Sequence, residues 1–414
     1  MCYCYYGGLA MLGTLFSAII AIFLFIDPLP FKEDNIAFFG ITLFIVATLF
    51  FLVQTFLFLF AWGPLQKIEQ NTLPRLIQTF QHDSTLRYTR LFLIFFLLAS
   101  YLIAIDALFL GNFSIRVLLV SWTLLLGIAT DMLHHLYKRA MRYLNPFEGV
   151  ENYYRNAFQS IQGGREDQVC DWIDAIAETT IKAMSKNSFA LSLLGADKLQ
   201  LIAKNYLEIA KNFTYASNAS SAPNRVSYLL FYLFQRYEYI FDKAVAQKIE
   251  LLCSNVISSL GKIAIYAAKY DMSIAAYPLH YLTKLAKRAQ NEGMQEVGNR
   301  AMLTMLEVSK TIIKEVDLQY VEIKEPFLAM IGSMDELAKE TFRRDKSISI
   351  QLLTQPFYDL KAVFSEGKVA SHQDQPDIVQ TIDRVLDEFA TLQTVLSTMP
   401  PISEILKQPQ PPQL

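Results

Sequence analysis

Four long apolar segments dominate the first third of the chain. They span residues 8–26, 36–62, 91–110 and 115–136. The first two contain no Asp, Glu, Lys or Arg, and the third contains only Asp106. A helix needs ~20 mainly apolar residues to cross a hydrocarbon core ~30 Å thick. The pattern therefore predicts four transmembrane helices within a membrane domain of residues 1–144.

The hydrophobic pattern changes after Asn145. Apolar residues now recur at positions i, i+3, i+4 and i+7, as in Leu199, Ile202, Ala203 and Tyr206, and this period is typical of amphipathic helices. Strand and hairpin patterns are nearly absent. Residues 145–400 are therefore predicted to form an all-helical domain, as a bundle or a solenoid. Residues 401–414 are rich in Pro and Gln, which predicts a flexible tail.

Helix boundaries in this second part are predicted from Gly, Pro and Asp. The predicted breaks are Gly163-Gly164, Gly195, Ala222-Pro223-Asn224, Tyr270-Asp271, Gly293, Pro326, Pro356 and Gln375-Pro376. Asp197, Asp271 and Asp377 are placed to cap a helix or to lie in its first turn, where carboxylates accept hydrogen bonds from free N–H groups.

Composition and charge sharpen this division. Apolar residues make up 53% of the chain and charged residues 18%, against ~25% charged residues in ordinary soluble domains. Residues 1–144 contain 9 Lys and Arg and 7 Asp and Glu, whereas residues 145–414 contain 28 and 32. These values argue against a disordered chain, a coiled coil and a basic nucleic-acid-binding protein.

Basic residues indicate the orientation in the membrane. They cluster after the second and fourth apolar segments, at Lys67, Arg75, Arg87, Arg90, Lys138, Arg139 and Arg142. Because cytoplasmic loops carry an excess of Lys and Arg, both termini are expected in the cytoplasm. Lys138, Arg139 and Arg142 are expected to contact anionic lipid.

Small residues recur every four positions on the first segment, at Gly13, Ser17 and Ala21. This spacing lets two helix backbones approach closely in lipid. It also arises by chance in a segment with this composition, and the sequence leaves both interpretations open.

Polar residues within the apolar segments are the candidate functional groups. Asp131 and His135 share a helix face, with His134 beside them; they indicate either a proton or metal site or simply a polar cytoplasmic helix end. Asp106 lies near the outer end of its segment, so its carboxylate is expected at the interface. Gln54 is expected to form a hydrogen bond between helices.

Motifs that carry known catalytic chemistry are absent from the sequence. It has no GxxxxGK[ST], GxGxxG, HExxH or GxSxG motif, so no catalytic residue, cofactor or metal ligand is predicted. Cys170 and Cys253 lie on apolar helical faces and are expected to be buried.

The first third resembles an uncharacterised family of bacterial integral membrane proteins, defined only as a domain of unknown function. The resemblance rests on Pro74-Arg75-Leu76, Phe80, Asp83 and the pair His134-His135. A later family motif around Asp271 lacks its Asn, Pro and Thr here. The resemblance implies a bacterial inner-membrane protein and carries no activity with it.

These features lead to two hypotheses. The first is a non-enzymatic membrane anchor or scaffold, whose helical cytoplasmic domain forms a homo-oligomer or binds other subunits of a membrane complex. The alternative is an oligomeric channel or transporter that uses Asp131, His134 and His135. The partners expected are the lipid bilayer and protein subunits, and not nucleic acid.

Overall fold

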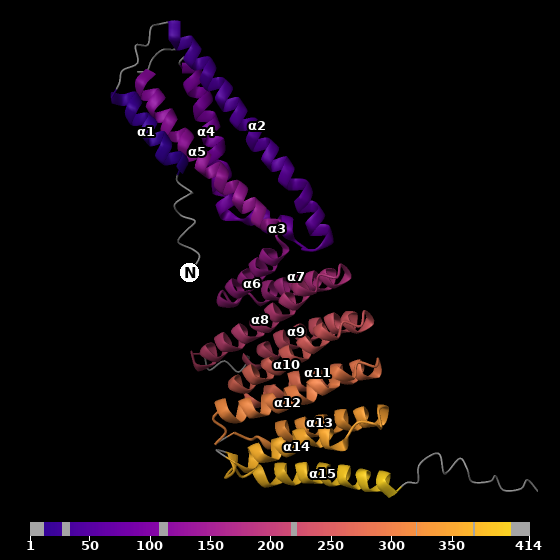
Figure 1. Ribbon diagram of the computed structural model, residues 1–414. Coiled ribbons are helices and arrows are strands. Elements are labelled where there is room, and N and C mark those ends of the chain that lie inside the picture. Colours follow the sequence, from indigo (N-terminus) through magenta and orange to yellow (C-terminus); the bar gives the residue numbers. More distant parts are fainter. Residues whose placement is uncertain are drawn as a thin grey trace, which may run out of the picture. The chain divides into compact units, whose positions relative to one another are not determined.

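The computed structural model describes residues 12–26, 34–106, 115–216, 222–319, 321–366 and 369–398. Within these ranges the regular elements are helices and there is no strand (Figure 1), which confirms the predicted all-α class. The chain divides into unit 1, Met1–Glu151, and unit 2, Asn152–Leu414. The predicted tail at 401–414 lies outside the described residues.

The described residues of unit 1 form five helices before α6. They are α1 (Leu12–Ile26), α2 (Asp34–Asn71), α3 (Leu76–His82), α4 (Ser84–Ile105) and α5 (Ile115–Tyr143). Helix α5 packs against α1 and α4, and α2 packs against α4. The Trp122 indole N–H donates to Ser100 Oγ at 3.0 Å and so joins α5 to α4 through a buried hydrogen bond.

The segment between the second and third apolar stretches is more helical than the sequence predicted. Residues 63–90 lie between the second and third predicted transmembrane helices, but α2 continues to Asn71, α3 follows, and α4 begins at Ser84. Helix α4 starts early because Asp83 caps it, and its carboxylate accepts hydrogen bonds from the N–H groups of Thr85 and Leu86.

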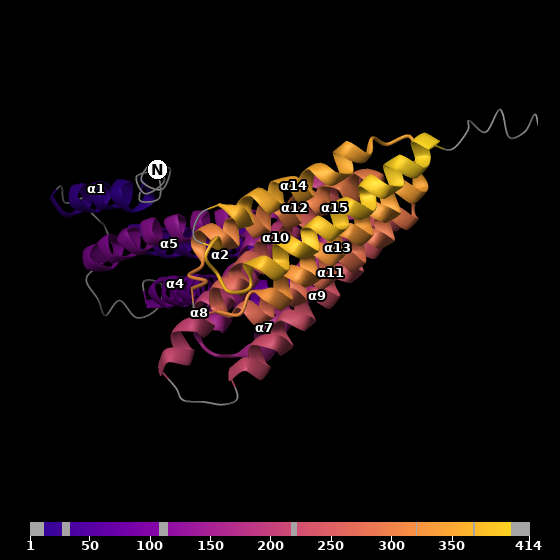
Figure 2. The same ribbon diagram turned by 90° about the horizontal axis from the view of Figure 1, so that it is seen from below.

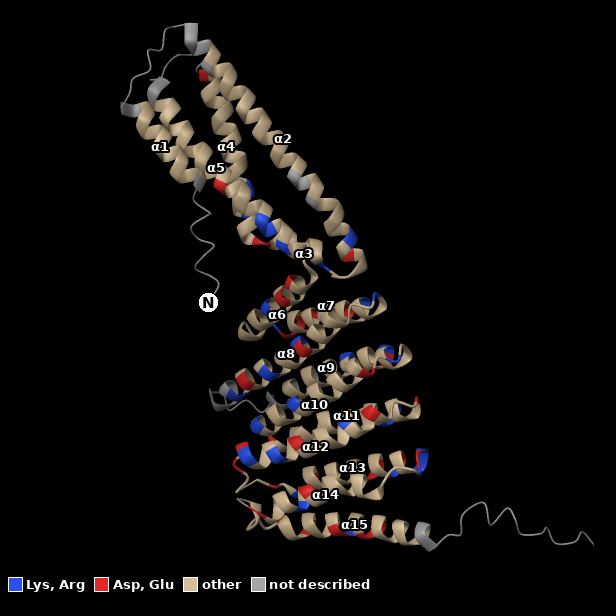
Figure 3. Ribbon diagram, viewed as in Figure 1, with Lys and Arg blue, Asp and Glu red and all other residues tan. Residues whose placement is uncertain are grey.

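Large apolar side chains face outward around unit 1. Phe16, Phe38 and Leu102 are 68%, 72% and 67% exposed, and many others on α1, α2, α4 and α5 are similarly placed. Lys and Arg, in contrast, gather near α3 and the last turns of α5 (Figure 3). Contiguous exposed apolar surface of this kind marks a binding or membrane surface.

Three described helical segments are long and apolar enough to cross a membrane: Ser84–Ile105, Val117–Tyr143 and Glu250–Tyr270. Helices α1 and α2 contain shorter apolar stretches, Gly13–Leu24 and Gly40–Phe56. The third long segment differs from the other two, because 61% of its apolar window is buried, against 33% and 22%. It is a core helix of unit 2.

Unit 2 is a two-layer stack of helical hairpins (Figures 1 and 2). After α6 (Pro146–Gln162), which contains the division between the units, its helices are α7 (Glu166–Ser185), α8 (Phe189–Ala216), α9 (Ala222–Ala246), α10 (Glu250–Tyr270), α11 (Ala276–Asn291), α12 (Gln295–Glu315), α13 (Lys324–Arg344), α14 (Ile350–Ser365) and α15 (Gln375–Thr398), with a short 3-10 helix η3 (Met272–Ala275) before α11.

From α7 onward, each helix packs against the next helix and against the one after it. Odd-numbered helices therefore form one layer and even-numbered helices the other. This connectivity is that of an α-solenoid, one of the two arrangements that the sequence left open. Helix α15 carries polar residues on the face that no other described helix covers, such as exposed Arg384 and Asp387.

Ion pairs connect successive helices within each layer. In the odd layer, Lys284 and Arg288 of α11 bind Glu238 and Asp242 of α9. In the even layer, Lys269 of α10 pairs with Glu315 of α12 at 2.6 Å. Pairs between exposed side chains contribute little stability singly, but they fix how each helix is placed along its neighbour.

Two predicted helix breaks are wrong, and so is one predicted cap. Gly195 and Pro356 lie inside α8 and α14. Gly195 is needed there for packing, since a Cβ at this position would lie 2.0 Å from Thr180 Oγ1 of α7. Asp197 also lies inside α8, where its carboxylate accepts a hydrogen bond from Asn255 of α10 at 3.1 Å.

Other boundary predictions are confirmed. Gly164 and Gly293 follow the ends of α6 and α11 with φ of +65° and +85°, a left-handed conformation that glycine adopts without strain. The Asp271 carboxylate caps η3 and accepts from the Ser273 N–H at 2.9 Å.

Candidate functional site

Asp131 binds the first turn of α1. Its carboxylate accepts hydrogen bonds from the N–H groups of Gly13 at 2.9 Å and Thr14 at 2.8 Å, and from the Thr14 hydroxyl. The first N–H groups of a helix lack partners within that helix, and its N-terminus favours negative charge. The carboxylate therefore serves as a cap supplied by another helix, which ties α5 to α1.

The two histidines next to Asp131 do not take part in this contact. His134 and His135 are both exposed side chains of α5. Within the part of the chain that the structure describes, no group of three or more His, Cys, Asp or Glu side chains is placed to bind a metal ion. The proton or metal site considered from the sequence stays a prediction.

The small residues of α1 face α5. Ser17 and Ala21 are 6% and 3% exposed. A Cβ at Gly127 of α5 would lie 1.8 Å from Ser17 Oγ and 2.7 Å from the Gly13 carbonyl oxygen. The two backbones thus approach to a distance that only glycine allows at position 127, and it is this glycine that sequence reasoning missed.

Gln54 and Asp106 each have a buried oxygen. Gln54 Oε1 and Asp106 Oδ2 have no hydrogen-bond partner among the described residues. The expected hydrogen bond from another helix to Gln54 is therefore not made at this oxygen. Gln54 lies within α2, and Asp106 directly follows the end of α4.

The basic C-terminal end of α5 contains an ion pair that the sequence did not predict. Arg139 donates to both oxygens of Asp83, from Nε to Oδ2 at 2.6 Å and from Nη2 to Oδ1 at 3.0 Å. The Tyr143 hydroxyl donates to Asp83 Oδ2 at 2.7 Å. Arg139 is thus engaged within unit 1, while its contact with lipid, like that of Lys138 and Arg142, stays a prediction.

Electrostatics at Asp83 favour the charged carboxylate. Burial raises the pKa of Asp83, but the hydrogen bonds from Arg139 and Tyr143 and the charge of Arg139 outweigh it and lower the pKa below the ordinary 3.8. Asp83 is one of the residues that carry the family resemblance, and the structure gives it the role of joining α4 to α5.

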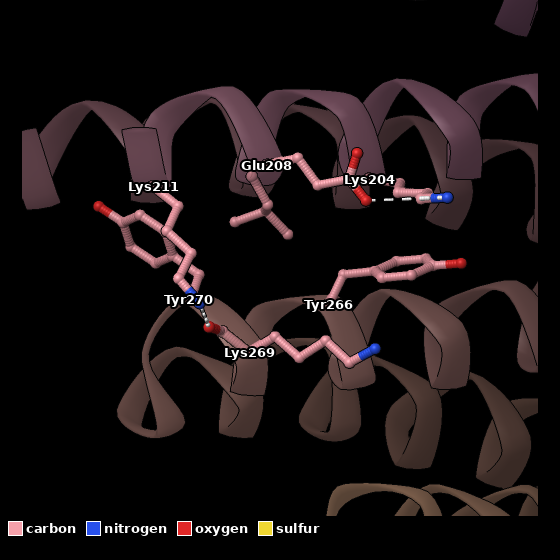
Figure 4. Close-up of a pocket in the computed structure, with 7 residues that line it drawn as sticks. Lys204, Glu208, Lys211, Tyr266, Lys269 and Tyr270 are labelled. Carbon is pink, nitrogen blue, oxygen red and sulfur yellow. Dashed lines mark hydrogen bonds and ion pairs between the residues drawn. The ribbon is translucent and has the colours of Figure 1, made fainter. Parts of the chain in front are cut away.

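A pocket of about 150 Å³ opens between α8 and α10 in unit 2 (Figure 4). Its lining residues are Lys204, Leu207, Glu208 and Lys211 of α8 and Tyr266, Lys269 and Tyr270 of α10. Residues four or seven positions apart fall on one face of a helix, so both helices present these side chains to the same space. The residues of this group are far apart in the sequence, as Lys211 and Lys269 are at 58 positions, so the group forms only when α8 and α10 pack together and no local pattern reveals it.

Two of the three lysines that line this pocket have weak or neutral partners, while Lys269 pairs with Glu315 of α12. Lys204 Nζ lies 3.7 Å from Glu208 Oε1 and 5.6 Å from the centre of the Tyr266 ring. Lys211 Nζ donates to the backbone carbonyl of Lys269 at 3.0 Å, a neutral acceptor that leaves its charge uncompensated. The pocket therefore presents net positive charge beside two aromatic rings.

A second, wider hollow of about 580 Å³ lies beside η3 and the first turn of α13. Its charged lining residues are the carboxylates Asp271, Glu322 and Glu325. Asp271 is already engaged as the cap of η3, so this hollow has no further feature that indicates a ligand.

The surroundings of the two described cysteines favour the protonated thiol. Burial, followed by the charges of neighbouring acids, raises the pKa of Cys170 to about 11, and burial raises that of Cys253 to about 12. Thiols with such pKa values stay protonated near neutral pH, and the thiolate is the reactive form.

Comparisons with known proteins give no functional assignment. No protein-family model matches the chain, and no curated protein is similar to it. One solved structure, described as a "circular tandem repeat protein with novel repeat topology and enhanced subunit contact surfaces", aligns at 15% identity over 93% of this chain and 90% of that chain, with a TM-score of 0.41. So distant a likeness supports no inference about function.

Proposed function

We propose that the protein is a non-enzymatic integral membrane protein, in which unit 1 is the anchor and unit 2 binds partner proteins. The observation that carries this proposal is the outward apolar surface of α1, α2, α4 and α5. Full burial of one such side chain is favourable by about 1.5–3 kcal/mol. Many of them together make an aqueous environment unfavourable for unit 1 and a bilayer favourable.

Charge placement supports a direction of insertion. The basic residues of unit 1 gather at the end that holds α3 and the last turns of α5 (Figure 3), and an excess of Lys and Arg favours the cytoplasmic side of a bacterial inner membrane for that end. Unit 2 follows α5 in the chain and would then be cytoplasmic.

The architecture of unit 2 supports a role in binding. Solenoids expose long surfaces relative to their size and use them to contact other macromolecules. In the described part of unit 2, some charged side chains form ion pairs between helices, and others line the two open hollows described above.

Membrane extraction of the full chain tests the anchor. Unit 1 inserted as proposed keeps the protein in the membrane pellet at high salt and at alkaline pH, and only detergent releases it. Release by salt or alkali alone would show surface attachment and contradict the proposal.

Protease added to inverted inner-membrane vesicles is expected to cut the turn at Gly164; protection of that turn would contradict the cytoplasmic placement.

The mass of the purified protein tests the binding role. We expect a homo-oligomer, or a complex with other membrane subunits, when the protein is extracted in mild detergent and analysed by light scattering. A lone monomer that co-purifies with no other protein would count against a scaffold.

Hydrogen bonding of Asp131 favours this proposal over transport. The carboxylate is engaged with the first turn of α1, as expected of a link between helices. Transport would depend on the exposed His134 and His135. Liposome flux that is abolished by Asp131→Ala with His134→Ala, in a variant that keeps its fold, would favour a channel instead.

A further inference from the structure

The pocket between α8 and α10 carries positive charges that are spaced along one line. Lys204 and Lys211 are seven residues apart on α8, which separates them by about 10.5 Å along the helix axis at 1.5 Å per residue. The backbone carbonyl of Lys269 on α10 accepts a hydrogen bond from the Lys211 ammonium, and the Lys269 side chain extends from there toward Tyr266 (Figure 4). A ligand that meets both ends of this row must itself carry more than one negative charge.

The charges of this row are available to a ligand. The Lys211 ammonium has a carbonyl as its acceptor and, within the described residues, no carboxylate at ion-pair distance. Lys269 pairs with Glu315, a carboxylate at the surface whose attraction solvent screens. Among the described residues that line the pocket, Glu208 is the single acidic one.

The size and walls of the pocket favour a side chain over a free small molecule. Its volume of about 150 Å³ is below the ~300–1,000 Å³ of typical small-molecule sites. Tyr266 and Tyr270 lie four residues apart on α10 (Figure 4). Leu207 lies between Lys204 and Lys211 along α8, and Leu207 and the two tyrosines give the pocket an apolar wall. Such a wall suits the apolar part of a peptide.

We propose that this pocket binds an acidic segment of a partner protein. Carboxylates on the segment contact Lys204 and Lys211, and an apolar side chain between them packs against Tyr266 and Leu207. A segment in the polyproline II conformation has three residues per turn and rises about 3.1 Å per residue, so acidic residues three positions apart lie on one face, about 9 Å apart, and match the two lysines. This inference rests on the proposed role of unit 2 in binding partner proteins.

The direct test measures binding of a defined probe to the full-length protein in nanodiscs of neutral lipid. The probe is a fluorescein-labelled peptide with Glu at every third position and Leu and Ala between, followed by fluorescence anisotropy. We expect binding that weakens as salt is raised, and no binding of the peptide that has Gln in place of Glu.

Variants assign the binding to this pocket. Lys204→Glu with Lys211→Glu is expected to weaken binding at least about tenfold, equivalent to 1.4 kcal/mol. Lys186→Glu with Lys346→Glu makes the same change in net charge at exposed positions of unit 2 away from the pocket, and its affinity should equal that of the wild type. Glu208→Gln removes the one repulsive carboxylate and is expected to strengthen binding, a gain that damage to the fold would not produce.

Three results would overturn the inference. They are absence of binding, equal weakening by the pocket and control variants, and full competition by inorganic phosphate, which would indicate a site for a single anion. Membrane extraction and the mass of the complex test the proposed function separately. A failure of the peptide to bind would therefore overturn this inference and leave the proposed anchor and scaffold roles unchanged. If the wild-type protein were soluble without detergent and still bound the peptide, the proposed role of unit 1 as a membrane anchor would be wrong and the peptide site would remain supported.

Discussion

The guanidinium of Arg139 binds the carboxylate of Asp83 through two hydrogen bonds, although the residues are 56 positions apart in the chain. The Asp83 side chain is 5% exposed, and it also caps α4. One carboxylate therefore fixes both the start of α4 and its contact with the last turns of α5. Such paired hydrogen bonds to an ionised group are among the stronger ones in proteins.

Removal of Asp83 is expected to destabilise unit 1. Asp83→Ala removes the cap and leaves Arg139 and Tyr143 without their acceptor, at a cost of about 2 kcal/mol or more. Asp83→Asn keeps an oxygen that can cap α4 and should cost less. Thermal unfolding in nanodiscs measures both, with Asp387→Ala on the exposed face of α15 as a control that changes stability by under about 0.5 kcal/mol. Equal midpoints for all three variants would contradict the role of Asp83.

A methyl group at Gly127 is expected to separate α1 from α5. Gly127→Ala brings a Cβ to 1.8 Å from Ser17 Oγ, and the overpacking should cost about 1–3 kcal/mol. Gly63→Ala is the matched control, because a Cβ there has nothing within 4 Å and alanine favours the helix by up to about 1 kcal/mol. Thermal midpoints in nanodiscs should move in opposite directions. A shift of the same sign for both variants would contradict the close approach.

Local patterns in the sequence were enough to predict the helical class, and long-range packing explains most of what they missed. The turn glycines Gly164 and Gly293 act through their own backbone, so their positions were predictable. Gly195 acts through contact with Thr180 on another helix, and it was misread as a break. The hairpins repeat with helices of 16 to 28 residues, so no fixed period marks the solenoid in the sequence.

The same distinction applies to the candidate sites. The shared helix face of Asp131 and His135 was visible from their spacing, but the partner of Asp131 is the backbone of α1, which no spacing reveals. The pocket between α8 and α10 combines residues from two helices, and neither helix carries a recognisable motif. Pairing between helices, and not residue type, decides which polar groups meet.

Acid is expected to weaken the contact between α9 and α11. Burial raises the pKa of Glu238, but the hydrogen bond and charge of Lys284 and the charge of Arg288 lower it below the ordinary 4.5. A carboxyl whose pKa is lower in the folded state adds stability above its unfolded pKa, and this contribution is lost as the pH falls through the folded pKa. The stability difference between wild type and Glu238→Gln should therefore shrink from about pH 6 to about pH 3. Hydrogen exchange of α9 and α11 at several pH values measures this stability difference. A difference that stays constant with pH would contradict the contribution of the ion pair.

Contact between α7 and α8 provides the sharpest test of the solenoid packing. A Cβ at Gly195 would lie 2.0 Å from Thr180 Oγ1 and 3.2 Å from its Cβ, so Gly195→Ala should destabilise unit 2 by about 1–3 kcal/mol. Gly332→Ala, which meets nothing within 4 Å on α13, should instead be neutral or stabilising by up to about 1 kcal/mol. Thr180→Ala removes the nearest atom, so the double variant with Gly195→Ala should regain much of the lost stability. Denaturant unfolding of the wild type, the two single variants Gly195→Ala and Thr180→Ala, and the double variant gives the coupling energy between positions 180 and 195. Losses of stability that simply add in the double variant would contradict this packing.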